Sequence, residues 1–144
     1  MHNKLTYHII LIVTFIMLII ASDHLLAETG KKPDPKAVKS GKVHYEKHCQ
    51  TCHQKNGVGE KPIPWGIRHP AYIPAMPLNE ASHAWHHSDE QLVKTILKGI
   101  ANRNMPAWGH ILSDKEATDI VAYIKSLWSS RILACQGPKH MSCM

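Results

Sequence analysis

The stretch that decides the fold is Cys49-Gln50-Thr51-Cys52-His53, which places two thiols three residues apart and an imidazole directly after the second. It follows a segment from Ala37 to His48 that contains no proline and repeats Val38, Gly41 and Tyr45 at helical spacing. This pattern predicts a short helix that ends at the two thiols. Cys-x-x-Cys-His is the attachment motif for c-type haem, in which each thiol adds to one vinyl group of a porphyrin. The adjacent histidine is then held over the iron.

Three other interpretations of the motif compete with haem: a thioredoxin-like dithiol, half of a zinc site, and a chance match. A dithiol site expects a pattern of parallel strands and helices, which this sequence lacks. A four-cysteine zinc site would need Cys135 and Cys143, at a spacing unlike that of the usual zinc ribbons. An export signal and the presence of His53 favour haem.

The first segment of the chain has the pattern of a secretory signal peptide. Lys4 lies in a short polar start, an unbroken apolar run extends from Ile9 to Ala21, and a short stretch then leads to Ala27. We predict that residues 1–27 are removed as a signal peptide and that the mature protein is periplasmic. The alternative is an uncleaved membrane anchor, because the stretch from Leu5 to Ala27 just reaches the roughly 20 residues that span a bilayer.

The length of the chain allows one domain with a short appendage at each end. Residues 28–36 are polar, contain two prolines and are predicted to form a linker. We place the domain at residues 37–129 and a tail containing cysteine, histidine and methionine at residues 130–144.

Two further helices are marked by capping boxes, which begin at Ser88 and Ser113 and are each followed by an apolar stripe. Five prolines lie between residues 56 and 82, so neither a long helix nor a central strand is expected there. No segment alternates apolar and polar residues with the period of a strand. The sequence therefore predicts an all-α domain of about three main helices.

Taken together, the motifs resemble those of class I monohaem cytochromes c. The resemblance runs from about Val38 to Trp128 and rests on Gly41-x-x-x-Tyr45 before the haem motif, Gly57 and Gly59 after it, Gly99-Ile100, Met105-Pro106-Ala107-Trp108, and the run from Asp119 to Ile124. It implies a cytochrome c-like domain wrapped around one covalently bound haem c. It also implies that the first helix crosses the last at Gly41 and Tyr45.

The second axial ligand of the iron has two candidates, in the pairs Met76-Pro77 and Met105-Pro106. Methionine suits electron transfer, because ligation by methionine and histidine raises the reduction potential. In the resembled family this methionine lies in a loop between a helix that ends in glycine and the C-terminal helix, which is the place of Met105. The resemblance thus implies the axial pair His53 and Met105, and a packing role for Met76.

Two other segments carry residue types that bind metals. The stretch from Ser82 to Ser88 holds three histidines, and we expect it to be a polar loop with hydrogen-bonding roles. Cys135 and Cys143 are expected to form a disulfide around Gly137-Pro138. The alternative is a copper site, since cysteine, histidine and methionine at this density suit Cu(I).

The formal net charge of +6 at pH 7 favours acidic protein partners or anionic membrane surfaces. Nucleic acid is not expected as a partner of an exported protein. The motif and the resemblance predict a single-electron carrier, not itself an enzyme, with Lys47, Lys55 and Lys61 around an exposed haem edge to steer an acidic redox partner. The alternatives are the haem subunit of a periplasmic dehydrogenase or oxidase complex, a small peroxidase, and a copper-handling module.

Overall fold

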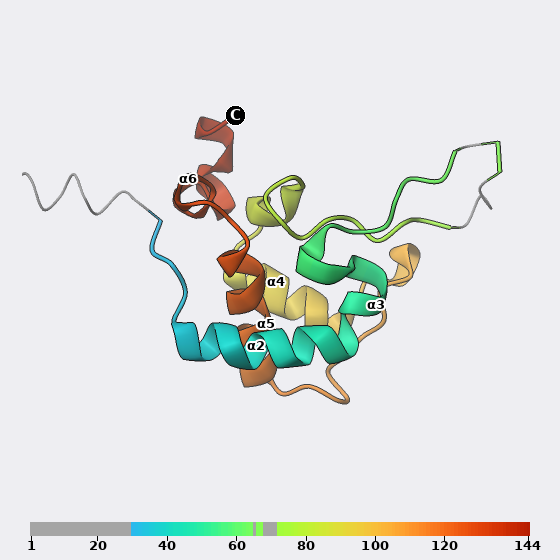
Figure 1. Ribbon diagram of the computed structural model, residues 1–144, viewed down its shortest axis with the longest axis horizontal. Coiled ribbons are helices and arrows are strands. Elements are labelled where there is room, and N and C mark those ends of the chain that lie inside the picture. The colour runs from blue at the N-terminus through green and yellow to red at the C-terminus, as the bar shows by residue number, and fades with distance from the viewer. Residues whose placement is uncertain (1–29, 65, 68–71) are drawn as a thin grey trace, which may run out of the picture.

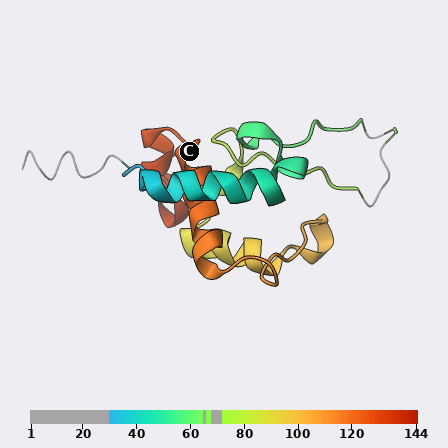
Figure 2. The same ribbon diagram turned by 60° about the horizontal axis from the view of Figure 1, so that its bottom comes forward.

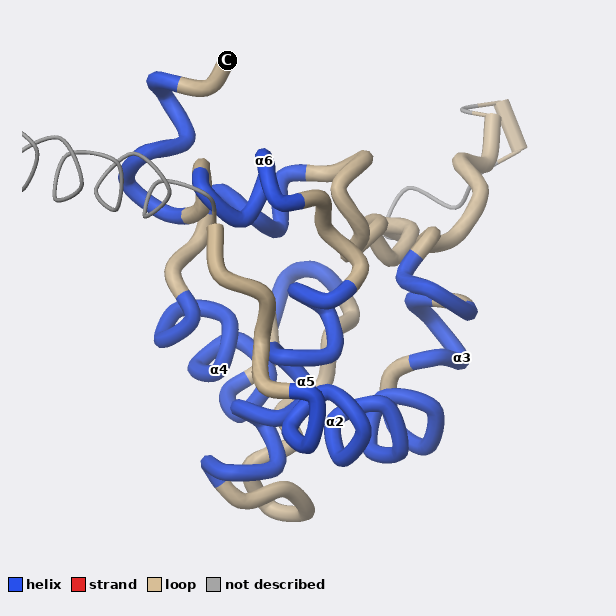
Figure 3. The backbone as a smooth tube through the Cα atoms, turned by 60° about the vertical axis from the view of Figure 1, so that its left-hand side comes forward, coloured by secondary structure: helices blue, strands red, loops and turns tan. Residues whose placement is uncertain are grey.

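The computed structural model describes residues 30–64, 66–67 and 72–144. The predicted signal peptide, residues 1–27, lies outside the described residues. Every named element among the described residues is a helix, and their only β-type pairing is an isolated bridge between Ile100 and Met105. The predicted all-α fold is confirmed (Figure 1; Figure 3).

Five α-helices and four 3-10 turns follow one another along the described chain. They are α2 (Pro35–His48), α3 (Gln50–His53), η1 (Lys55–Gly57), η2 (His83–His86), α4 (Asp89–Lys98), η3 (Ala101–Arg103), α5 (Asp114–Ser126), α6 (Ser130–Ala134) and η4 (Gly137–Ser142). Both predicted capping boxes are present: Ser88 caps α4 with Gln91, and Ser113 caps α5 with Glu116. None of the helices among these residues is long and apolar enough to cross a membrane.

Helix α2 begins two residues before the predicted Ala37. The side chain of Asp34 accepts a hydrogen bond from the Ala37 N–H at 3.2 Å, and Pro35 occupies the first turn, where it costs no hydrogen bond. The last two residues of the predicted linker, Pro35 and Lys36, therefore belong to the helix.

The implied crossing of the first and last main helices is confirmed. Helices α2 and α5 pack together, and a Cβ atom added at Gly41 would collide with the backbone of Asp119 and Ile120. Tyr45 is fully buried, and its ring lies 4.9 Å from the ring of Tyr123, measured between centroids. Glycine is required at the crossing because the two backbones leave no room for a side chain.

Replacing Gly41 by alanine is expected to lower the free energy of unfolding by about 3 kcal/mol, because the two helices must separate to admit the Cβ atom. Denaturant unfolding of the haem-loaded protein measures this effect. Gly66→Ala is the control, since a Cβ atom there meets no atom of the described residues within 4 Å. Equal stability of the two variants would contradict the close crossing.

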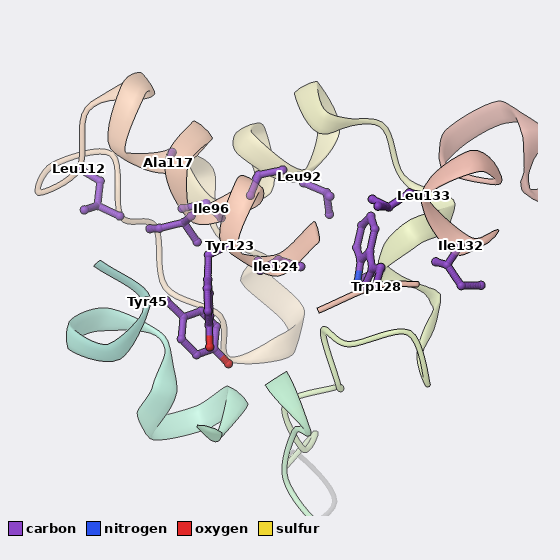
Figure 4. Packing of buried hydrophobic residues seen from close by; sticks show 13 residues of the cluster. Tyr45, Leu92, Ile96, Leu112, Ala117, Tyr123, Ile124, Trp128, Ile132 and Leu133 are labelled. Carbon is purple, nitrogen blue, oxygen red and sulfur yellow. The ribbon is translucent and has the colours of Figure 1, made fainter. Parts of the chain in front are cut away.

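The C-terminal residues pack onto the core, although the sequence suggested a tail from residue 130. Ile132 and Leu133 of α6 are buried in the same cluster as Trp128, as Figure 4 shows. The side chain of Gln136 donates to the Asp89 carboxylate at 2.6 Å, next to the start of α4. Short-range patterns did not reveal this packing, because α6 has only five residues.

Cys135 and Cys143 are joined by a disulfide that closes the segment around η4. We expect alkylation of the unreduced protein to label neither cysteine. We also expect Cys135→Ser with Cys143→Ser to lower the free energy of unfolding by about 2 to 3 kcal/mol, because the short loop is no longer constrained in the unfolded chain. Labelling of both thiols in the native protein would refute the disulfide and restore the copper alternative.

An irregular loop joins η1 to η2: its described residues, 58–64, 66–67 and 72–82, form no named helix or strand, as the prolines predicted. Its two described limbs run next to each other and extend well beyond the helices (Figure 1; Figure 2). Backbone hydrogen bonds close the base of the loop, from Glu60 N–H to the Ala75 carbonyl at 2.9 Å and from Leu78 N–H to the Gly57 carbonyl at 2.7 Å. This base adjoins the end of α3, where the haem motif lies.

Candidate haem-binding site

The haem motif lies at a sharp joint between two helices. Cys49 ends α2 and begins α3, and the single turn of α3 carries Cys52 and His53. The Cys49 carbonyl accepts from the His53 N–H at 2.9 Å, which places the imidazole one turn after the first thiol. Both cysteines of the motif are free thiols; Cys49 is half-buried and Cys52 is exposed.

A cavity of about 380 Å³ opens beside this joint and is lined mainly by apolar side chains. Its volume is within the range of small-molecule and cofactor pockets. Cys49, Cys52 and His53 line it from one part of the chain, and Met105 lines it from the loop between α4 and α5. Met76 also contributes, from the irregular loop. The fold thus brings the four predicted haem residues to one cavity.

The imidazole of His53 is oriented by a main-chain carbonyl. Its Nδ1 lies 2.9 Å from the carbonyl oxygen of Met76, so the neutral ring donates from Nδ1 and keeps the lone pair of Nε2 free. Burial lowers the pKa of His53, although the bond to Met76 acts in the opposite direction. The neutral imidazole is the form that ligates a metal. A metal-ligating histidine usually donates a hydrogen bond from its other ring nitrogen.

This contact gives Met76 a role that sequence analysis missed. The sequence assigned its side chain to packing, and the residue is 39% exposed. Its carbonyl, however, fixes the tautomer and orientation of His53. Every residue carries a carbonyl, so no residue type in the sequence marks the position.

The Cys49 thiol lacks the lowered pKa that a reactive dithiol requires. Burial and the nearby Cys52 raise the pKa of Cys49 to about 11. Thioredoxin-like dithiols depend on a thiol whose pKa is lowered. The tail cysteines are joined to each other, so they are not available to complete a four-cysteine zinc site.

Met105 is presented by a tight loop that begins where α4 ends. Gly99 closes α4 with a φ of 68°, and a Cβ atom there would collide with the backbone from Met105 to Ala107. The Ile100 N–H donates to the Met105 carbonyl at 2.9 Å, and the Trp108 N–H donates to the Ile96 carbonyl at 3.1 Å. Met105 is half-buried against the core, so its thioether is held more firmly than that of the exposed Met76.

Within the histidine-rich stretch, which was predicted to be a polar loop, His83–His86 form the 3-10 turn η2. His83 and His87 line the cavity, whereas the ring of His86 stacks on His140 of η4 with centroids 4.5 Å apart. The two stacked rings are nearly parallel, at 16°. The stretch therefore connects the cavity wall to the disulfide-closed C-terminal segment.

The donor set fits a haem c. Two free thiols, a neutral imidazole and a thioether line one apolar cavity, and the guanidinium of Arg103 supplies a cation at its wall. Such a group has two thiol attachment points, two axial positions and an apolar macrocycle, and each has a counterpart here.

Comparison with known proteins shows the family of the chain. The family model described as "Cytochrome C oxidase, cbb3-type, subunit III" matches residues 36–124. The "Cbb3-type cytochrome c oxidase subunit CcoP" of Azospirillum brasilense is 27% identical over 106 residues, which are 74% of this chain. The match covers 34% of that relative, so the chain spans about a third of its length. No solved structure matches the chain significantly.

The family match covers the haem motif, the Met105 loop and most of α5. The resemblance to c-type cytochromes that the sequence indicated is thereby confirmed. The chain belongs to the family of c-type cytochrome domains named for subunit III of cbb3-type cytochrome c oxidase, and its role is electron transfer through haem c.

Proposed function

We propose that this chain binds one haem c, through thioethers from Cys49 and Cys52 and with His53 and Met105 as the axial ligands. When bound, the haem supplies a reversible one-electron couple. The observation that carries the proposal is the placement of Met105 and the haem motif, which are far apart in sequence, in the wall of one apolar cavity. The sequence holds a single Cys-x-x-Cys-His motif, which supports one haem.

In this proposal the protein would hold the side chains of His53 and Met105 in place and would exclude water from the haem iron. The Met76 carbonyl holds His53, and the hydrogen bonds around Gly99 and Trp108 hold the Met105 loop. The core side chains Leu92, Ile96, Ile120 and Ile124 complete the apolar wall. A ligand set that does not change between oxidation states keeps the structural cost of each electron transfer small.

We further propose that the electrons go to a terminal oxidase, with this chain as a haem-bearing subunit of the complex. The family and the relative are both named as subunits of cbb3-type oxidase. They favour this role over that of a free carrier between unspecified partners. A peroxidase would need an open iron position, which ligation by Met105 closes.

The docking surface that we propose is basic and surrounds the haem motif. Lys47, Lys55 and Lys61 are exposed on α2, η1 and the first limb of the irregular loop. Cys52, between them in sequence, is itself exposed, so one edge of the haem site opens to solvent at this place. Positive charge here would steer an acidic partner.

We propose that residues 1–27 direct export to the periplasm and are then removed, so that the mature chain begins at Glu28. The polar segment from residue 28 then leads into the domain. The intact mass of the protein, together with membrane fractionation, distinguishes a cleaved signal peptide from a retained anchor.

The test of the oxidase role is electron delivery from the reduced protein to a cbb3-type oxidase that lacks its own subunit III, followed as oxygen consumption. We expect turnover that slows as ionic strength rises, because screening removes steering by lysines. Changing Lys47, Lys55 and Lys61 to glutamate should reduce the rate at low salt by about tenfold or more. The same change at Lys36, Lys39 and Lys139 is the control for net charge. Failure of the parent protein to reduce the oxidase would reject the role.

A further inference from the structure

A carboxylate lies in the wall of the cavity, at the base of the irregular loop. Glu60 is half-buried and lines the cavity together with Tyr72. Its carboxylate accepts from the Ala75 N–H at 2.7 Å and from the Tyr72 hydroxyl at 2.6 Å. Its backbone N–H donates to the Ala75 carbonyl at 2.9 Å. Glu60 therefore holds both polar groups of the Ala75 backbone.

These bonds lead directly to His53. Ala75 precedes Met76, whose carbonyl lies 2.9 Å from Nδ1 of the imidazole. On the other side, Gly59 precedes Glu60 and donates its N–H to the His53 carbonyl at 2.9 Å. The two limbs approach so closely that a Cβ atom at Gly59 would meet the Ala75 carbonyl oxygen at 2.8 Å. Glu60 thus joins the two backbone segments that contact His53.

We propose that Glu60 is a positioning residue for electron transfer, which holds the Met76 carbonyl against Nδ1 of His53 and thereby sets the reduction potential. The proposal rests on the proposed function, because it requires His53 to be an iron ligand. A hydrogen-bond acceptor held firmly at Nδ1 makes the imidazole a stronger electron-pair donor through Nε2. A stronger electron-pair donor favours the ferric state.

The charge of Glu60 acts in the same direction. Hydrogen bonds from Tyr72 and from the Ala75 N–H hold the pKa of Glu60 below its usual value. The carboxylate is therefore ionised at neutral pH. A negative charge beside an apolar cavity stabilises the ferric state, which carries one more positive charge than the ferrous state. Hydrogen bonds to an ionised acceptor are also stronger than those between neutral groups, so the ionised Glu60 holds the Ala75 backbone more firmly.

The test compares Glu60→Ala and Glu60→Gln with matched changes at Glu46. Glu46 is an exposed carboxylate on α2 that pairs with Lys42 at 2.6 Å, so its replacement changes net charge equally at a different place. Redox titration of the haem-loaded proteins gives the equilibrium between ferric and ferrous forms. Hydrogen exchange of the Ala75 amide separately reports how firmly Glu60 holds the Ala75 N–H.

We expect Glu60→Ala to shift this equilibrium about tenfold toward the ferrous form, which raises the potential by about 59 mV for one electron. Glu60→Gln, which keeps an acceptor for Ala75 but loses the charge, should shift it less. Tyr72→Phe should act in the same direction, and both changes at Glu46 should shift it less than twofold. The Ala75 amide should exchange at least tenfold faster in Glu60→Ala than in the parent.

A Glu60→Ala protein with the potential of Glu46→Ala would overturn the proposal, even if Ala75 exchanged faster, because Glu60 would then only stabilise the loop. If Glu60→Ala does not fold, Glu60→Gln and Tyr72→Phe decide instead, and parental potentials in both would overturn it. The optical spectrum separates this outcome from failure of the proposed function. A parent without low-spin haem rejects ligation by His53 and Met105, whereas unshifted potentials in low-spin variants reject only the role of Glu60.

Discussion

Met105→Ala is expected to abolish the weak near-infrared band that arises from charge transfer between a methionine sulfur and ferric iron. The same change should lower the reduction potential by on the order of 100 mV or more, within the roughly 0.8 V range over which axial ligands set haem potentials. Loss of the thioether removes a donor that favours ferrous iron. The vacated position should then bind cyanide or carbon monoxide.

Met76→Ala is the matched control for this experiment. Met76 also precedes a proline and lines the same cavity, but its contact with His53 is made by the main-chain carbonyl, which alanine retains. The band should survive in this variant. Survival of the band in Met105→Ala with its loss in Met76→Ala would exchange the two assignments. Absence of the band from the parent would restore the enzyme alternative.

Cys49→Ser combined with Cys52→Ser is expected to remove covalent attachment completely. Haem should then extract from the denatured protein into acid acetone, whereas the parent should keep all of its colour, because thioether bonds survive unfolding and axial bonds do not. The single variants should each retain one bond and show a shifted absorption of the reduced pyridine complex. Spectra of the extract and of the pellet measure both results.

The double change Cys135→Ser with Cys143→Ser is the control, since it also replaces two cysteines by serines, but at a disulfide away from the haem motif. These two cysteines form the disulfide around η4 and do not line the cavity. Haem should stay in the pellet of this variant. Extraction of haem from the parent itself would reject covalent attachment through the motif.

Much of the fold was predictable because its signals are local. The capping boxes at Ser88 and Ser113 begin α4 and α5 where expected, since a cap depends on residues within one turn of each other. The prolines of the irregular loop exclude regular structure by their own geometry. The close helix crossing at Gly41 was instead implied by the family resemblance, and the backbone of α5 does lie against it.

The parts that sequence analysis missed depend on contacts between distant segments. Helix α6 is too short to show a clear apolar period, and it is stabilised by burial of Ile132 and Leu133 against residues such as Trp128. The predicted boundary at residue 130 therefore separated a tail from a domain to which it belongs. The stack of His86 on His140 likewise joins two segments that no local pattern connects.

The sequence by itself indicated the chemistry: the order of Cys49, Cys52 and His53 is that of the attachment motif for c-type haem. Only the tertiary structure decided the surroundings of that chemistry. The acceptor for His53 is the carbonyl of Met76, and Glu60 holds the backbone that presents it. Side chains with special chemistry are visible in a sequence, whereas a backbone carbonyl is the same at every residue and acquires a role only where folding places it.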